Sequence, residues 1–560
     1  MEHITQALAR SITSLFNLDV TPELTRPDEQ FGEYATNVAL QLAGRLQRQP
    51  RDVATELVES VRGELGDQVK DITIAGPGFI NITLSDATLL RAAHTAVSTK
   101  PTTYAGQVVV TEYSDPNPFK VLHAGHLYTT LVGDAISRLV AVSGGDVHRV
   151  NFGGDVGLHV AKNMWAICHM LNNDPAGLDA LDTDPHKRAA WLSARYVEGN
   201  TAYEEDKAAK AEIIEVNKKV YQLHADNDHE SDFAHIYWTC RQWSYDYFAV
   251  LYAELKVVPF EKYYPESETT PIGVATVEEQ LAKGVYEKSD GAIIFNGEKY
   301  GLHTRVFMNS HGLPTYEAKD VGLIMKKWQD YHFDTSIIIT GNDIVEYMKV
   351  VQKSIEQFAP DLTKRSVHLT HGNLKLKGGM KMSSRKGNVL LALDVLEVAT
   401  AANKALDGRG DSHDTMLGAV KYAFLKQRIG GDIVYDPAES VSLEGNSGPY
   451  LQYAHARARS ILAKADQAPA AITGLEPGER SLVRKISEYP DAVERAVVDL
   501  MPHHVCGYLY ELAQVFNRFY EHNHVIGDER QAIRLQLVQL YADVLRDGLE
   551  LLGITAPERM

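Results

Sequence analysis

The chain has 560 residues, a formal net charge of −18, 44% hydrophobic residues and 23% charged residues. This length is too great for one hydrophobic core and predicts two to four domains. The acidic balance excludes a general affinity for nucleic acid, and the absence of an 18-residue apolar run or a signal-peptide pattern predicts a cytoplasmic protein without a membrane span. Three scattered cysteines without a CxxC pair argue against a disulfide framework or a cysteine zinc site, and no protein-bound metal is expected.

Residues 1–98 are expected to form a small α+β domain. Residues 1–16 have helical periodicity, and the segment 31–37 is expected to open a second helix that continues through Leu42. Residues 69–84 alternate apolar and polar side chains around a Gly-Pro-Gly turn, which predicts two strands. Residues 98–103 are predicted to form a linker.

From residue 107 onward, strands alternate with helices, as in a parallel sheet with crossover helices. The run 108–110 predicts a buried strand, and two prolines then force a turn before a helix that begins at His123-Ala124-Gly125-His126. Further strands are predicted at 148–152, 292–295 and 336–340. Residues 162–259 are predicted to form a helical insertion in this domain.

The turn at residues 123–126 combines three features suited to phosphate chemistry. Gly125 lets a planar group approach the backbone, and a helix N-terminus favours phosphate. His123 and His126 are three apart, so they share a face and can both donate hydrogen bonds to charge developing on a phosphoryl group.

Three later segments carry further candidate residues. Tyr316 and Asp320 are four apart at a predicted helix start and are expected to project together, although a surface pair has the same spacing. Gly341 and Asp343 follow a predicted strand, where open α/β sheets bind ligands. Residues 362–388 contain seven Lys/Arg and no acid, and the glycines around Lys381 predict either a charged lid or a solvated linker.

Beyond about residue 398 no strand pattern is found, and an all-helical domain is expected. Tyr450, Tyr453 and Arg457 give one helix an aromatic and basic character that suits RNA, although aromatic residues at this spacing are more often part of a core. The predicted helices cover residues 415–428, 447–464, 477–487, 492–501, 508–523 and 530–552.

Together these segments resemble the class I aminoacyl-tRNA synthetases, and within that class the arginyl-tRNA synthetase family. Residues 123–126 are similar to the HIGH motif and residues 381–385, KMSSR, to the KMSKS loop. Family-specific likeness extends over nearly the whole chain and lies in residues 31–34, 76–81, 114–120, 445–457 and 557–560.

The resemblance implies a fold and a reaction. The fold is an α/β class I synthetase fold: a Rossmann-like parallel-sheet catalytic domain at 107–398 with the helical insertion at about 162–259, an N-terminal α+β tRNA-binding domain at 1–98 and a C-terminal all-α anticodon-binding domain at 399–560. The reaction is ATP-dependent activation of L-arginine, with Mg²⁺ on the ATP, and transfer of arginine to the 3′ adenosine of tRNA(Arg). It also implies that tRNA must be bound before arginine is activated, and a monomer is the default expectation.

The resemblance also assigns residue roles. The catalytic residues are His123, His126, Lys120 and Lys381, and the same resemblance implies an ATP site and an arginine site. The implied ATP-binding residues are His123, Gly125, His126, Gly341, Asp343, Lys381, Met382 and Ser383. The implied arginine-binding residues are Glu112, Asp115, Asn117, His126, Tyr316 and Asp320. The implied tRNA-binding residues are Phe31, Tyr34, Asn37, Tyr450, Tyr453 and Arg457.

The sequence differs from the class motif at Ser384 and from the family pattern at Asp115, Val156 and Ile344. Ser384 stands where KMSKS has its second lysine, and Lys120 matches the position that supplies the missing charge in the family. Asp115 stands where Ser is more common, and Ile344 where Gln usually helps to hold the substrate. Our hypothesis is that Asp115 or Asp343 accepts a hydrogen bond from the α-amino group of arginine.

Three other interpretations fit part of the pattern. A cysteinyl-tRNA synthetase shares the helical C-terminal type, but three scattered cysteines do not supply its zinc pocket. A small-molecule nucleotidylyltransferase also uses an HxGH turn, but the C-terminal helices and the Lys381 segment count against it. A non-catalytic tRNA-binding paralogue would be expected to lose His123, His126 or Lys381, and all three are present.

Overall fold

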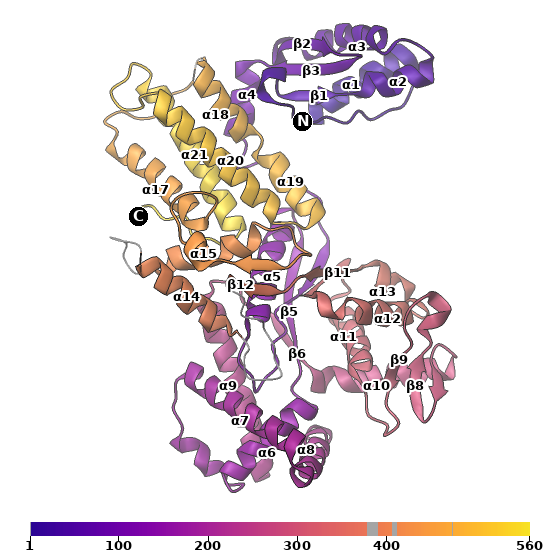
Figure 1. The fold of residues 1–560 in the computed structure, drawn as a ribbon. Coiled ribbons are helices and arrows are strands. Elements are labelled where there is room, and N and C mark those ends of the chain that lie inside the picture. Colours follow the sequence, from indigo (N-terminus) through magenta and orange to yellow (C-terminus); the bar gives the residue numbers. More distant parts are fainter. Residues whose placement is uncertain (1, 378–389, 406–411, 473) are drawn as a thin grey trace.

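The N-terminal domain is a three-stranded antiparallel sheet packed on helices. The computed structural model describes residues 2–377, 390–405, 412–472 and 474–560 (Figure 1). The strands lie in the order β1-β3-β2, and the predicted hairpin over 69–84 is confirmed. The elements are α1 Glu2–Phe16, β1 Tyr34–Thr36, α2 Val38–Leu46, α3 Pro50–Leu65, β2 Val69–Ala75, β3 Phe79–Leu84 and α4 Asp86–His94.

The prediction that residues 31–37 open the second helix is wrong. Tyr34–Thr36 pairs with β3 as a strand, and the helix begins only at Val38. Gly32 explains the difference, because a Cβ at this position would lie 2.6 Å from the carbonyl oxygen of Ile82, and its φ of +93° favours glycine. The chain therefore lies directly on β3 before the helix starts.

The catalytic domain is built on a five-stranded parallel sheet in the order β11-β10-β4-β5-β6. Helix α5 (Ala124–Val142) follows the central strand β4 and buries one face of that sheet with Leu127, Leu131 and Ile136. Such a sheet exposes its ligand-binding edge at the carboxyl ends of the strands. The strands are β4 Val108–Glu112, β5 Asp146–Gly153, β6 Lys262–Pro265, β10 Thr335–Gly341 and β11 Ser366–His371.

The expectation that residues 292–295 belong to the parallel sheet is wrong. They form β8 (Ala292–Phe295), the middle strand of a separate antiparallel sheet with β7 (Glu287–Ser289) and β9 (Arg305–Met308). A run of four apolar residues predicts a strand but carries no information about its partner. This small sheet lies between α10 (Glu266–Ala282) and α11 (Tyr316–Tyr331) in the chain.

The predicted insertion is helical and has a hydrophobic core of its own, which includes Met164, Leu192 and Trp243. Figure 1 shows α6, α7 and α8 grouped at the bottom of the view, below the parallel sheet. Its helices are α6 Leu158–Met170, α7 Pro185–Glu205, α8 Lys207–Ala225 and α9 Asp232–Glu254.

The C-terminal part is helical, as predicted, with one exception. Residues Ile433–Tyr435 form β13, which pairs in parallel with β12 (Leu374–Leu376), so the expectation of no strand beyond residue 398 is wrong. Three residues are too few to produce a periodic signal. The predicted boundary at residue 398 falls inside α14. The helices are α14 Ala392–Lys404, α15 His413–Leu425, α16 Pro437–Ser440, α17 Gly448–Lys464, α18 Pro477–Ser487, α19 Tyr489–Asp499, α20 His503–His522 and α21 Gln531–Leu551.

Ion pairs join the N-terminal domain to the C-terminal helices. Arg26 contacts Asp491 at 2.7 Å, and Arg480 contacts Glu33 at 2.8 Å. Figure 1 shows this domain against the upper end of the helical region. In the described part of the chain, no helix combines the length and apolar character needed to cross a membrane.

Candidate active site

The two histidines at the start of α5 cap each other's backbone. His123 Nδ1 accepts from the N–H groups of Gly125 (3.0 Å) and His126 (3.3 Å), and His126 Nδ1 accepts from the His123 N–H at 3.3 Å. The rings stack at 3.7 Å. Because each Nδ1 acts as an acceptor, the proton of each neutral ring sits on Nε2, which remains a donor.

Both histidines are neutral at physiological pH. Burial, together with the nearby Lys120 ammonium, lowers the pKa of His123 to about 4. Burial and the neighbouring His123 lower the pKa of His126 well below its ordinary value. Gly125 is required beside them, since a Cβ there would lie 2.8 Å from Cε1 of His123 and displace the ring. This turn presents two oriented neutral N–H donors.

The segment before this turn is held in a strained conformation. Ser114, Asp115 and Phe119 have φ angles of 75°, 48° and 68°, in the left-handed region that side chains disfavour. Asp115 accepts from the Phe152 N–H at 2.8 Å. Asn117 Oδ1 accepts a hydrogen bond from the backbone N–H of Gly154, the residue after β5, at 2.7 Å. These bonds fix the segment against the carboxyl end of β5.

Several acidic residues lie close together at the predicted arginine site. Glu112, at the end of β4, is buried and paired with Lys327 of α11. Desolvation and the neighbouring carboxylates of Glu112 and Glu266 raise the pKa of Asp320 well above its ordinary value. Desolvation and Glu112 do the same to the pKa of Asp115. A cation placed here would relieve this repulsion.

Asp320 has a partner that the sequence did not reveal. Tyr347, on α12 (Val345–Glu356), donates a hydrogen bond from its hydroxyl to Asp320. Tyr316, the first residue of α11, is 63% exposed, and its ring centroid lies 5.3 Å from Lys319 Nζ. Tyr347 follows the strand β10 by six positions, and only its helical spacing from Asp343 and Ile344 could have suggested it.

Two lysines of this region make different contacts. Lys120 Nζ lies 4.0 Å from the ring centroid of Tyr196, and burial lowers the pKa of Lys120 to about 8. Lys319 is buried and pairs with Glu266 at 2.5 Å. Lys319, Glu266 and Tyr196 were not predicted from sequence, because isolated lysines, acids and tyrosines in helices carry no motif.

His159, on α6, is a third neutral histidine at this edge that the sequence analysis missed. Its Nε2 donates to the carbonyl oxygen of Gly154 at 2.8 Å. Burial and Lys120 lower the pKa of His159 to about 3. His159 therefore fixes the backbone at Gly154, whose N–H donates to Asn117.

The remaining predicted ATP-site residues divide into two groups. Gly341 ends β10, the neighbour of β4, and the exposed Asp343 folds back toward it, so that a Cβ on Gly341 would lie 2.6 Å from Asp343 Oδ1. Lys381, Met382 and Ser383 lie outside the described residues. The chain that follows is anchored beside the histidine turn, where the carbonyl of Leu390 accepts from the Ala124 N–H at 2.8 Å.

The predicted tRNA-binding residues have different exposures. Phe31, Asn37 and Arg457 are exposed, as is Tyr453 at 41%. Tyr450 is partly buried and accepts from Asn517 at 2.8 Å.

Tyr34 is not available at the surface, contrary to the prediction. It is buried in β1 beneath the guanidinium of Arg26, which lies 4.2 Å from its ring centroid. In a strand, alternate side chains face the core, and Tyr34 is one of these. Its ring therefore supports the interface of the N-terminal domain with α19 through Arg26 and Asp491.

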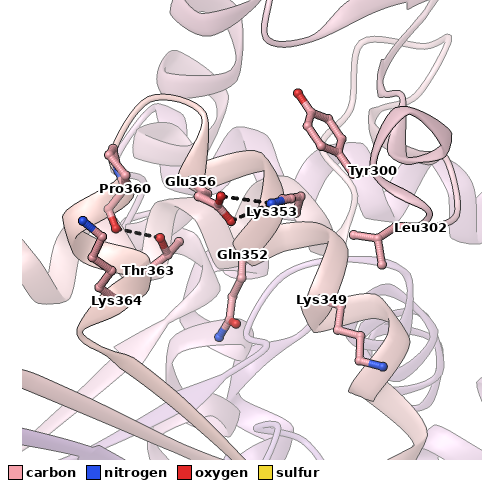
Figure 2. Close-up of a pocket in the computed structure, with 9 residues that line it drawn as sticks. All are labelled: Tyr300, Leu302, Lys349, Gln352, Lys353, Glu356, Pro360, Thr363 and Lys364. Atoms are coloured by element: carbon pink, nitrogen blue, oxygen red, sulfur yellow. Dashed lines mark hydrogen bonds and ion pairs between the residues drawn. The ribbon is translucent and has the colours of Figure 1, made fainter.

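A surface hollow lies apart from these residues, on α12 and α13 (Pro360–Lys364), with Tyr300 at its edge (Figure 2). Its lysines are largely paired, for example Lys353 with Glu356 at 2.9 Å, as Figure 2 shows. No predicted site residue lines it.

Three family models match the chain and define its class. They are "Arginyl tRNA synthetase N terminal domain" (residues 2–84), "tRNA synthetases class I (R), catalytic domain" (89–428) and "DALR anticodon binding domain" (451–560). The parallel sheet and the histidine-capped helix thus belong to a class I aminoacyl-tRNA synthetase, and the predicted fold class is confirmed.

The chain belongs, more narrowly, to the arginyl-tRNA synthetase family. It is 31% identical to the arginine--tRNA ligase of Thermobifida fusca, over 99% of each chain, and 30% identical to that of Flavobacterium psychrophilum, over 91% of this chain and 88% of the other. These relatives favour the arginine family over the cysteine enzyme.

Solved structures show the same fold. The Thermus thermophilus arginyl-tRNA synthetase matches with a TM-score of 0.82 at 24% identity, covering all of both chains. The Plasmodium falciparum enzyme matches with a TM-score of 0.81 at 20% identity, covering 100% and 99%. The N-terminal domain, the catalytic sheet and the helical C-terminal part therefore all have counterparts in known members of the family.

Proposed function

We propose that this chain is an arginine–tRNA ligase that consumes ATP. A carboxylate oxygen of arginine attacks the α-phosphorus of ATP, an O–P bond forms, and the bond to the β-phosphate oxygen breaks to release pyrophosphate. A ribose hydroxyl of the 3′ adenosine of tRNA(Arg) then attacks the carbonyl carbon of the adenylate and releases AMP. Positioning and stabilisation of phosphate charge supply most of the catalysis in such a reaction.

The observation that carries this proposal is the acidic cluster around Asp320. Loss of water and two neighbouring acids raise the pKa of this carboxyl group, so its ionised form lacks a sufficient counter-charge. A guanidinium is planar, always charged and matched to carboxylates. Bound arginine would therefore satisfy Asp320, with Tyr347 holding one carboxylate oxygen.

The neutral histidines would stabilise the phosphate oxygens. His123 and His126 each present an Nε2–H donor, because their Nδ1 atoms accept hydrogen bonds from backbone N–H groups. Neutral donors fixed in advance need no reorganisation when charge develops. Gly125 leaves space beside them for the nucleotide.

Lys120 would supply positive charge from the same turn, since Ser384 replaces the second lysine of the KMSKS loop. Its pKa of about 8 keeps it mostly protonated at neutral pH. Lys381 would hold the departing pyrophosphate. Mg²⁺ would enter with ATP, because this cation is bound mainly by phosphate oxygens and water in such sites.

The α-amino group of arginine requires a further acceptor, for which we propose Asp115 or Asp343. Asp115 already accepts from Phe152, while Asp343 is exposed at the end of β10. Solving the arginine-bound structure tests this assignment. Both carboxylates lying more than about 4 Å from the α-amino nitrogen would refute it.

The two end domains would bind tRNA(Arg). We propose that the exposed Tyr453 and Arg457 on α17 contact the anticodon stem-loop, and that Phe31 and Asn37 contact the body of the tRNA. We further propose a cytoplasmic monomer that requires bound tRNA to activate arginine.

One assay tests the central proposal. ATP–pyrophosphate exchange should be measured with each amino acid in turn, with and without tRNA. We expect exchange with arginine in the presence of tRNA. Exchange driven by cysteine, or no arginine-dependent exchange even with tRNA, would refute the proposed function.

A further inference from the structure

One face of α7 fixes this helix tightly against α6. A Cβ on Gly199 would lie 1.9 Å from the carbonyl oxygen of Lys162, so the two backbones are in direct contact. Asn200 Oδ1 accepts from Lys162 Nζ at 2.8 Å, and the ring of Tyr203 lies 4.2 Å from the same ammonium. These contacts leave α7 little freedom to rotate or slide.

Tyr196 lies on the same face, one turn before Gly199 and Asn200. The register set by these contacts brings its ring to within 4.0 Å of Lys120 Nζ. Helix α7 belongs to the insertion (Figure 1), whereas Lys120 precedes the histidine turn of the catalytic domain along the chain. Thus a side chain from the insertion reaches the phosphate side of the proposed site.

Lys120 has few other groups to stabilise its charge. Within the residues that the structure describes, no carboxylate lies within ion-pair distance of its ammonium, and the nearby charge of Lys162 further lowers the pKa of Lys120. An aromatic face attracts a cation through its quadrupole, most strongly where water is scarce. The Tyr196 ring is therefore the group that orients this lysine.

The insertion also reaches the second site lysine. The hydroxyl of Tyr221, on α8, lies near Lys319. The Tyr221 hydroxyl and Lys319 Nζ each lie 3.8 Å from the Cβ position of Gly157. Two tyrosines on successive helices thus reach the two lysines of the site.

We propose that Tyr196 is a positioning residue for adenylate formation, whose ring holds the Lys120 ammonium toward the ATP phosphates and so couples the packing of the insertion to the reaction. This inference rests on the proposed function, since Lys120 meets ATP only there. In this proposal Tyr196 acts through Lys120 and not on arginine or the reacting phosphate directly.

The test compares ring-removing and ring-retaining variants in arginine-dependent ATP–pyrophosphate exchange with tRNA present. Tyr196→Leu should lower kcat/KM for ATP about tenfold, the loss expected for a partly desolvated cation–π contact. Tyr196→Phe keeps the ring and should stay within about twofold of wild type. Tyr300→Leu is the control, because it removes a tyrosine–lysine contact that involves neither Lys120 nor α7.

A double-mutant cycle separates positioning from a merely structural role. In a Lys120→Ala background, Tyr196→Leu should have no further effect, whereas independent effects would multiply. Thermal unfolding of each variant shows whether it is folded, and Tyr196→Met serves as a second ringless variant if the leucine variant unfolds.

The outcomes are distinguishable. Multiplying losses in the double variant, or equal activity of Tyr196→Leu and Tyr300→Leu, would overturn the inference while leaving the proposed function intact. Absence of arginine-dependent exchange in the wild type would instead overturn the proposed function.

Discussion

Replacing His123 with asparagine separates the two functions that we assign to this residue. His123 caps α5 through Nδ1 and offers Nε2–H to the phosphate. Asparagine is among the best N-cap residues, so its amide oxygen can replace the cap. It has no group that reaches as far as the imidazole Nε2, and the donor is lost.

The two effects differ in size. Loss of stacking on His126, whose ring centroid lies 3.7 Å away, should lower the free energy of unfolding by about 1 kcal/mol. Loss of one oriented donor should lower the exchange rate by about 10²–10³, equivalent to about 2.7–4 kcal/mol of transition-state stabilisation. The variant should therefore be folded and nearly inactive.

The assay pairs urea unfolding with arginine-dependent ATP–pyrophosphate exchange in the presence of tRNA. His123→Ala is the comparison, since it loses both cap and donor and should cost about 1 kcal/mol more in unfolding than the asparagine variant. If His123→Asn kept a third or more of the wild-type rate, His123 would be only a helix cap and the donor argument would fail.

Four further predictions concern other parts of the molecule. As pH rises through about 8, Lys120 loses its proton and kcat/KM for ATP should fall. In Lys120→Arg this decline should move to higher pH, because the guanidinium group stays protonated. A decline at the same pH in both proteins would exclude Lys120 as its source. Asp320→Asn should raise KM for arginine about 10- to 100-fold with little change in KM for ATP, and an unchanged arginine KM would refute its role. Gly199→Ala should lower the free energy of unfolding in urea by about 1–3 kcal/mol, because the added methyl group pushes α7 away from α6. Gly507→Ala should not lower it, because nothing lies within 4 Å of the Gly507 Cβ position. Equal effects of the two substitutions would contradict the close packing. Arg457→Ala should raise KM for tRNA in aminoacylation and weaken its salt dependence, and an unchanged KM would argue against contact at this position.

The motifs of the sequence located the α5 turn correctly because their chemistry is local. His123 and Gly125 act within one helical turn, and strand β4 and the prolines after it set the start of α5. The failures at 31–37 and 292–295 have a different origin. Gly32 packs against Ile82, fifty residues away, and a strand's choice of partner depends on residues that a local pattern does not contain.

The partners of the site residues could not be predicted either. Tyr347 reaches Asp320 from α12, Lys327 neutralises Glu112 from α11, and Tyr196 reaches Lys120 from an insertion helix. Each pair is separated by 27 or more residues along the chain. No spacing rule connects such residues, because only the packing of helices against the sheet edge brings them together.

The sequence by itself determined the class of the protein, the family and the order of its domains, since these depend on short motifs whose spacing along the chain carries their chemistry. Only the tertiary structure decided which charges meet. The protonation of Asp320, His123 and Lys120 depends on burial and on neighbours from distant elements. Desolvation and Coulomb interactions act through space, and the order of residues alone does not record those distances.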